Sequence, residues 1–117
     1  MEVSPATRAD LKRYQDVAER LRVVLLTKQQ VQVRLSEIEG ALRELQGLKS
    51  GDRVYKVVGS IIVSKSVDEV VKELNEAKES LELRLQALSK QESLLKKQLE
   101  DLERRLTRRL GGGGSAG

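Results

Sequence analysis

Apolar residues recur at alternating spacings of three and four along the first part of the chain. This spacing forms one apolar stripe along a helix, and a stripe that continues over so many turns is typical of a coiled coil. One polar residue, Lys28, interrupts the series. The predicted seam, with alternating a and d positions, consists of Tyr14, Val17, Leu21, Val24, Lys28, Val31, Leu35, Ile38, Leu42 and Leu45.

Both ends of this first helix carry local signals. Ser4 is suited to cap free N–H groups through its hydroxyl, and Pro5 suits the first turn, where its missing N–H would be unpaired anyway. Gly47 or Gly51 is expected to end the helix, since glycine adopts the left-handed conformation at low cost. We therefore predict a coiled-coil helix over residues 5–49.

The same spacing returns from residue 66 onward. Ser66 and Glu69 read as a capping box, in which each side chain binds the backbone N–H of the other residue. Asp68 adds negative charge at the positive end of the helix dipole. We predict a second coiled-coil helix over 66–110, with the seam Val67, Val71, Leu74, Lys78, Leu81, Leu85, Leu88, Glu92, Leu95, Leu99, Leu102 and Leu106.

The segment 53–65, between the two helices, is rich in β-branched residues. Gly59-Ser60 fits a two-residue turn with Gly59 at positive φ. This turn predicts the pairs Val58–Ile61, Val57–Ile62, Lys56–Val63 and Tyr55–Ser64. Both faces are then substantially apolar, and an isolated two-stranded hairpin with open edges is marginal in water. We expect oligomerisation into a shared sheet or barrel through Val54, Val57, Val58, Ile61, Ile62 and Val63.

An antiparallel packing of the two helices predicts their register, because a positions of one helix then face d positions of the other. One constant offset pairs Tyr14–Leu102, Leu21–Leu95, Leu35–Leu81 and Leu42–Leu74, and brings residue 49 beside Val67. Lys28 and Glu92 then fall in adjacent layers, within reach of each other. We hypothesise that this pair fixes the register at some cost in stability. The alternative is that each side chain reaches water on its own.

The composition narrows the classes of function. Only Tyr14 and Tyr55 are aromatic and 34% of the residues are charged, a mix typical of long helices with a narrow core. The absence of Cys and His removes disulfides, thiolate catalysis and the commonest general base and metal ligand. We expect no enzyme activity, no cofactor and no metal. No apolar run approaches a membrane span, so a soluble, cytoplasmic protein is expected.

The chain becomes strongly basic near its C-terminal end. Residues 104–117 hold four arginines and no acidic residue. One explanation of this positive charge is that it complements the negative C-terminal end of the helix dipole. The alternatives are binding to an acidic protein partner or to nucleic acid. No aromatic side chain accompanies the arginines to stack on bases. Residues 111–117 (GGGGSAG) are expected to form a flexible tail, a composition also typical of an expression remnant.

Several apolar residues lie off the predicted seam. Leu26 and Val33 occupy f positions one heptad apart, which a two-helix hairpin exposes. Scattered apolar residues on a surface are normal, and the alternative is a weak hydrophobic surface for another apolar polypeptide. The set comprises Val23, Leu26, Val33, Leu83, Leu94 and Leu110.

The hairpin segment 54–63, followed by a helix from Asp68 to Leu106, resembles the β subunits of the prefoldin family, and archaeal ones most of all. The resemblance covers residues 8–110 and is strongest over 54–106. A single hairpin between the helices is typical of the β type, whereas the α type has two. The resemblance implies a mainly α fold, in which a long antiparallel two-helix coiled coil is joined by one β-hairpin that assembles into an intersubunit β-barrel.

The resemblance also implies an ATP-independent chaperone, or holdase, built as a hetero-hexamer of two α-type and four β-type subunits (α2β4). Such a complex captures unfolded polypeptides at its coiled-coil tips and delivers them to a group II chaperonin. The chaperonin-contact candidates are then Arg104, Arg105, Arg108 and Arg109. Both chain ends lie at the tips in this family, so the client-binding candidates are Val3, Leu11, Tyr14, Val17, Leu102, Leu106 and Leu110.

Two other classes of function stay open at this point. One is a coiled-coil scaffold or tether without a client, which would not suppress the aggregation of an unfolded protein. The other is a basic coiled coil that binds nucleic acid, with strongly salt-dependent affinity that is lost when the arginines of 104–109 are replaced.

Overall fold

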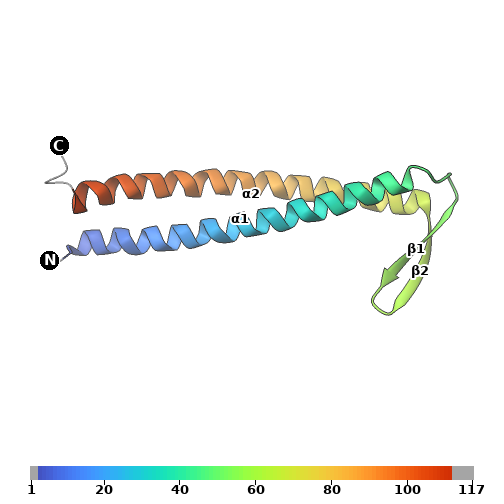
Figure 1. Cartoon of the computed structure of the whole chain (residues 1–117), viewed down its shortest axis with the longest axis horizontal. Helices are drawn as coiled ribbons and strands as arrows, with labels where there is room; N and C mark the ends of the chain where they lie inside the picture. Colours follow the sequence, from blue (N-terminus) through green and yellow to red (C-terminus); the bar gives the residue numbers. More distant parts are fainter. Residues whose placement is uncertain (1–2, 112–117) are drawn as a thin grey trace. The chain divides into compact units, whose positions relative to one another are not determined.

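The computed structural model describes residues 3–111, in the order α1 (Pro5–Leu45), β1 (Arg53–Val58), β2 (Ile61–Ser66) and α2 (Val67–Leu110) (Figure 1). The predicted mainly α fold, with two long helices and one antiparallel hairpin between them, is therefore confirmed. The predicted Gly-rich tail lies outside the described residues, apart from Gly111. In the described part of the chain, neither helix is both long and apolar enough to span a membrane.

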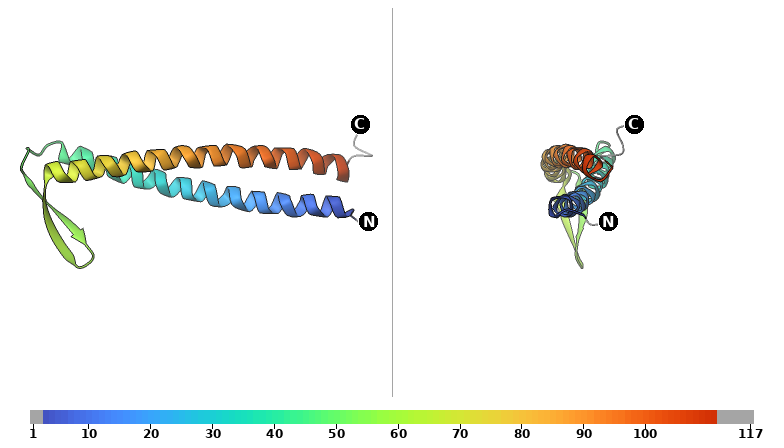
Figure 2. Two further views of the ribbon diagram at one scale, coloured as in Figure 1. Left: turned by 180° about the vertical axis from the view of Figure 1, so that it is seen from behind. Right: turned by 90° about the vertical axis from the view of Figure 1, so that its left-hand side faces the viewer.

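The chain divides into two compact units. One unit contains the residues up to Lys28 and those from Ala87 onward, and the other contains Gln29–Gln86. In the first unit the start of α1 and the end of α2 run antiparallel and side by side (Figure 2). The second unit holds the end of α1, the hairpin and the start of α2.

Both units have a core built from the predicted seam. The apolar residues that are buried in the described part of the chain all belong to it. In the first unit they are Val17, Leu88, Leu102 and Leu106, and in the second they are Val31, Leu35, Ile38 and Val67. The heptad pattern therefore identified the core residues correctly.

The start of α1 follows its predicted signals. The Thr7 N–H donates to the Ser4 hydroxyl at 3.1 Å, and the Arg8 N–H donates to the Ser4 carbonyl at 2.9 Å. Pro5 is the first helical residue. The first bond satisfies a backbone N–H that a helix start leaves without an intrahelical partner, and the second is the first bond of the helix itself.

The helix α1 ends at Leu45, earlier than residue 49, because its last turn tightens. The Gln46 N–H bonds the Arg43 carbonyl at 3.2 Å, and the Leu48 N–H bonds the Leu45 carbonyl at 3.1 Å. These three-residue spacings are typical of a helix terminus that unwinds into turns. Of the two glycines considered for the stop, Gly51 has a positive φ, of 89°.

The hairpin has the predicted register, and its pairing extends to Arg53 and Ser66. Gly59 has a φ of 59°, while Ser60 does not have a positive φ. A positive φ at the first turn position alone is the pattern of a type II′ turn, whose twist matches that of the flanking strands. A Cβ at position 59 would meet no atom, so the backbone conformation is what favours glycine there.

Polar contacts connect the hairpin to the start of α2. The Val67 N–H donates to the Asp52 carbonyl at 2.7 Å, and the Glu69 N–H donates to the Ser66 hydroxyl at 3.2 Å, which is one half of the predicted capping box. Asp68 accepts hydrogen bonds from the Ser50 hydroxyl at 2.9 Å and the Gly51 N–H at 3.2 Å. The turn before β1 is thereby attached to the first turn of α2.

The Lys28–Glu92 pair forms as expected. The Lys28 ammonium lies 2.8 Å from one carboxylate oxygen of Glu92, and Lys96 lies 2.7 Å from the other. The side chains of Lys28 and Glu92 are 25% and 15% exposed, so water reaches this pair only partly. Whether the pair also fixes the register stays a prediction.

Candidate interaction surfaces at the hairpin and the helix ends

The hairpin exposes large apolar side chains on both faces. Successive residues of a strand point to opposite faces, so the Val58–Ile61 pair occupies one face and the Val57–Ile62 pair the other. The exposed fractions are 71% for Val57, 68% for Ile62, 63% for Ile61, 51% for Val58 and 73% for Tyr55. The remaining two candidates, Val54 and Val63, are half-buried.

The two faces of the hairpin differ in what surrounds them. Lys56 and Lys65 share the face of Val58, and both approach Glu73 of α2, at 3.9 and 2.5 Å. The hydrogen bond from Lys65 lowers the pKa of Glu73. This face is therefore tied to α2 by charge, while Tyr55 and Val57 on the other face are open to solvent.

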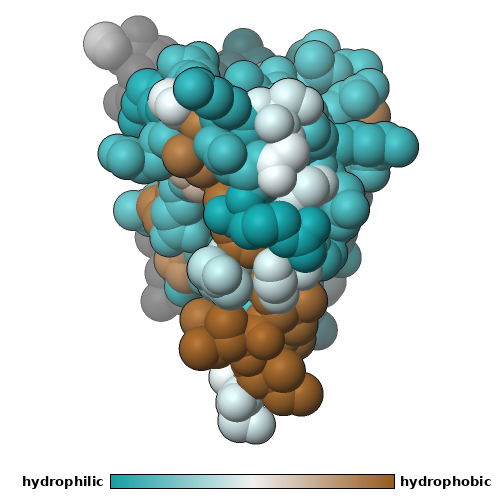
Figure 3. Space-filling view, turned by 90° about the vertical axis from the view of Figure 1, so that its right-hand side faces the viewer, coloured by the Kyte–Doolittle hydropathy of each residue, from teal (hydrophilic) through white to brown (hydrophobic). Residues whose placement is uncertain are grey.

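Apolar residues of the hairpin gather into one area in the space-filling view (Figure 3). Soluble monomers rarely expose so concentrated an apolar surface, and the strand edges beside it carry unpaired N–H and C=O groups. The hairpin is thus suited to pair with other strands and to bury its apolar faces against other chains.

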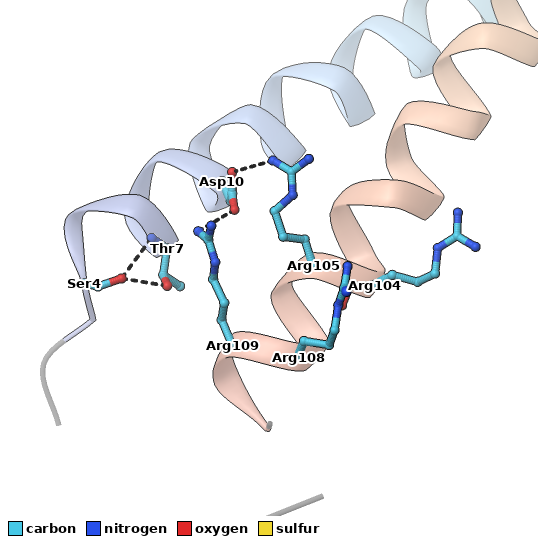
Figure 4. Close-up of polar contacts among 7 residues, drawn as sticks. All are labelled: Ser4, Thr7, Asp10, Arg104, Arg105, Arg108 and Arg109. Carbon is cyan, nitrogen blue, oxygen red and sulfur yellow. Dashed lines mark hydrogen bonds and ion pairs between the residues drawn. The ribbon is translucent and has the colours of Figure 1, made fainter. Parts of the chain in front are cut away.

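A cluster of one carboxylate and two guanidinium groups joins the start of α1 to the end of α2. It is here named the Asp10 cluster and consists of Asp10, Arg105 and Arg109. One oxygen of Asp10 lies 3.4 Å from an Arg105 nitrogen, and the other lies 2.6 Å from an Arg109 nitrogen (Figure 4). The Asp10 side chain is only 11% exposed, whereas those of Arg105 and Arg109 are 47% and 38% exposed.

The other two arginines of the basic segment have different contacts. Arg104 pairs with Asp101 on its own helix and has a side chain that is 69% exposed. In Figure 4 it points away from α1. Arg108 donates to the Arg104 carbonyl at 3.4 Å. The four chaperonin-contact candidates are therefore not equivalent, since Arg105 and Arg109 bind the buried carboxylate of Asp10 on the other helix, whereas Arg104 pairs only with an exposed carboxylate on its own helix.

The seven client-binding candidates fall into two groups. Val17, Leu102 and Leu106 are buried in the seam, with exposed fractions of 4%, 4% and 8%. The accessible candidates are Leu110, which is 58% exposed, and the half-buried Val3, Leu11 and Tyr14. Thus only part of the set is available in the conformation described.

Tyr14 makes a second polar contact between the helices near their ends. Its hydroxyl donates to a Glu103 oxygen at 2.9 Å. This hydrogen bond and the negative charge of Glu103 raise the pKa of Tyr14 above its ordinary value. This hydrogen bond gives the start of α1 a second polar link to the end of α2.

Two of the off-seam apolar residues meet in an open groove of the first unit. Val23 of α1 and Leu94 of α2 are 50% and 63% exposed. They line the groove with Val24 and Leu95 of the seam and with polar rim residues Glu19, Arg20, Gln91 and Gln98. Three further apolar residues off the seam are exposed as well: Leu26, Val33 and Leu83.

Sequence reasoning missed Asp10. Its signal was present, because counting the heptad backward from Tyr14 places Asp10 at a d position and Thr7 at an a position. Both are buried, at 8% and 4% exposure. The predicted seam contained only residues from Tyr14 onward, so it did not include Asp10, which pairs with Arg105 and Arg109.

Among residues 3–111, no group of three or more His, Cys, Asp or Glu is arranged to hold a metal ion. The polar clusters that do occur are ion pairs between the chain's own side chains.

Comparisons with known proteins point to one family. The model of the prefoldin subunit family matches residues 8–113. Similar proteins include prefoldin subunit beta of Caldivirga maquilingensis, 43% identical over 96% of this chain and 93% of that protein. Prefoldin subunit beta of Saccharolobus islandicus is 41% identical over 91% and 84% of the two chains.

A solved structure is similar as well. The crystal structure of the prefoldin beta subunit from Thermococcus strain KS-1 matches with a TM-score of 0.81 and 37% identity. The match covers 91% of this chain and 93% of that one. The chain therefore belongs to the prefoldin family, as a chaperone subunit of the β type and not an enzyme.

Proposed function

We propose that this chain is a subunit of an ATP-independent holdase, which captures unfolded polypeptides at the ends of its paired helices and delivers them to a group II chaperonin. Membership of the prefoldin family over residues 8–113 is the observation that carries this proposal. It fits a chain whose described part offers apolar and charged surfaces for binding. The proposed location of this activity is the cytoplasm.

The proposed assembly is a hexamer of two α-type and four β-type chains (α2β4), with hairpins joined in a β-barrel. The exposure of Tyr55, Val57, Ile61 and Ile62 supports it, because burying these side chains stabilises an assembly by about 25 cal/mol per Å² of apolar surface removed from water. Strand edges that are open in the isolated hairpin would be paired in a barrel.

Client binding is proposed for the helix ends, through Val3, Leu11, Tyr14 and Leu110 in the conformation described. Each subunit offers only a small apolar area there, so a single contact would be weak. Several ends that hold one client together raise the overall affinity without any deep pocket. Val17, Leu102 and Leu106 would take part only when the ends separate.

Chaperonin binding is proposed for the basic segment, with Arg104 and Arg108 the more available members. Arg104 is well exposed and points away from α1 (Figure 4). An acidic surface on the partner would complement this charge, and such contacts mainly raise the association rate and weaken with salt.

The direct test measures aggregation of a denatured protein diluted into buffer with the assembled complex, without nucleotide. We expect suppression by light scattering, and we expect Leu110→Glu in every β chain to reduce it. Leu83→Glu is the matched control, since Leu83 is 61% exposed and lies in the other unit. A complex that forms but leaves aggregation unchanged would favour a scaffold without clients.

A further inference from the structure

Asp10 is the only charged residue that is buried in the part of the chain from 3 to 111. A buried carboxylate is costly unless cations and hydrogen bonds compensate for its lost hydration. Asp10 has two such partners, at 2.6 and 3.4 Å, and both come from consecutive turns of α2 (Figure 4). The stability of Asp10 in this position thus depends on α1 and α2 staying together.

The Asp10 cluster lies between the chain ends and the apolar seam of its unit. Leu106, which stands between Arg105 and Arg109 in the sequence, is buried. Leu102 and Val17 continue the seam away from the ends, and both are 4% exposed. On the other side of the cluster, the seam position of α1 is the polar Thr7.

We propose that the Asp10 cluster holds the start of α1 and the end of α2 together. It thereby controls whether the buried side chains of Val17, Leu102 and Leu106 are accessible to an apolar segment of a client protein. The role of the Asp10 cluster in keeping the two helix ends together, here called its closing role, rests on the contacts of the cluster alone. The link to clients rests on the proposed function.

The physical consequence is a change in populations. While the ends are together, three apolar side chains are hidden, and a client that needs them binds only the open fraction. Weakening the Asp10 cluster enlarges that fraction, so apparent client affinity rises in proportion. Removing one arginine leaves the buried carboxylate with less compensation, which favours the hydrated, open state. Removing the carboxylate of Asp10 eliminates both contacts between the helices and acts in the same direction.

The absence of native cysteine provides a clean measurement of opening. Leu106→Cys introduces a single thiol in the buried seam, and its alkylation rate reports how often the ends separate. Adding Asp10→Asn should raise this rate by at least about tenfold, which corresponds to a loss of more than about 1.4 kcal/mol when both contacts of the buried carboxylate are removed. Arg109→Gln should act in the same direction.

Two controls make the test specific. Asp16→Asn makes the same chemical change at an exposed position of α1 and should leave the rate for Leu106→Cys unchanged. A thiol placed by Leu88→Cys, in the same seam but away from the ends, should not respond to Asp10→Asn. Combining Asp10→Asn with Arg109→Gln should add little to the larger single effect, because Arg109→Gln removes a contact that Asp10→Asn already removes.

Equal labelling with Asp10→Asn and Asp16→Asn would overturn the closing role. If labelling rises, the Asp10→Asn complex should also suppress aggregation at a lower concentration than wild type. Faster labelling with unchanged capture would overturn the link to clients. A wild-type complex that captures nothing would instead refute the proposed function, while the labelling result for the Asp10 cluster would still hold.

Discussion

Single polar residues within the apolar seam form ion pairs between α1 and α2. Lys28 and Glu92 meet where the surrounding seam positions are mostly Leu and Val, and the hydrogen bonds from Lys28 and Lys96 lower the pKa of Glu92 to about 2. Their pairing was predictable, because two polar a positions fall in adjacent layers. Asp10 was not predicted, because the repeat was counted only from Tyr14 onward.

The lowered pKa of Glu92 predicts an acid-sensitive contribution to stability. Its folded value of about 2 lies below the ordinary 4.5, so the ionised pair stabilises the fold above about pH 4.5 and this stabilisation is lost as the pH falls toward 2. We expect the gap in thermal midpoint between wild type and Glu92→Gln to shrink across that window. A gap of equal size at pH 7 and at pH 2 would contradict this.

The Lys28–Glu92 pair also predicts non-additive substitutions. Lys28→Leu or Glu92→Leu alone leaves one charge in the seam without its partner, so each should lower the denaturant midpoint. The double variant should lose much less than the sum of the two, since it restores an apolar layer. Additive losses would mean that the two side chains act independently and do not fix the register.

At the scale of elements, the hairpin was predictable in its register and not in its attachment to α2. Gly59-Ser60 defines a two-residue turn, and from that turn every strand pair follows. The contacts of Lys56 and Lys65 with Glu73 depend on the angle between a strand and a helix, which a repeat pattern does not encode. The early end of α1 at Leu45 likewise depends on local turn bonds.

Gly59 predicts a backbone-specific loss in the hairpin. Gly59→Val should destabilise it by roughly 1–2 kcal/mol, because a residue with a Cβ strains the left-handed conformation. The proposed complex should then dissociate at a lower denaturant concentration, as followed by size exclusion. Gly47→Val is the control, since Gly47 has no positive φ and open space around its Cβ position. Equal effects of the two substitutions would contradict the turn argument.

The exposed apolar side chains of the hairpin predict a separation of assembly from helix formation. Ile61→Asp should dissociate the proposed complex, because a charge buried without a partner costs several kcal/mol, while the helix signal in circular dichroism is largely retained. Sedimentation would measure the dissociation. Leu83→Asp, on an exposed helix position, should leave the complex intact. An Ile61→Asp protein that still sediments as the complex would rule out a shared barrel.

At the scale of the whole molecule, composition and periodicity established the fold class and the seam, and the hairpin segment indicated the family. Accessibility was the part that pattern alone missed. Three of the seven client-binding candidates are buried, because they belong to the predicted seam. Two of the four arginines are paired with Asp10, because the seam of α1 continues to Asp10, farther than the apolar repeat indicates.

The central claim is that this chain holds unfolded polypeptides as part of a multi-subunit complex joined by its hairpins. Native mass spectrometry of the chain mixed with an α-type subunit and a denatured client tests it most directly. We predict a mass of two α and four β chains carrying one client, formed without nucleotide and lost with Ile61→Asp. A complex of that mass that never carries a client, or a client bound equally well by the dissociated chain, would contradict the claim.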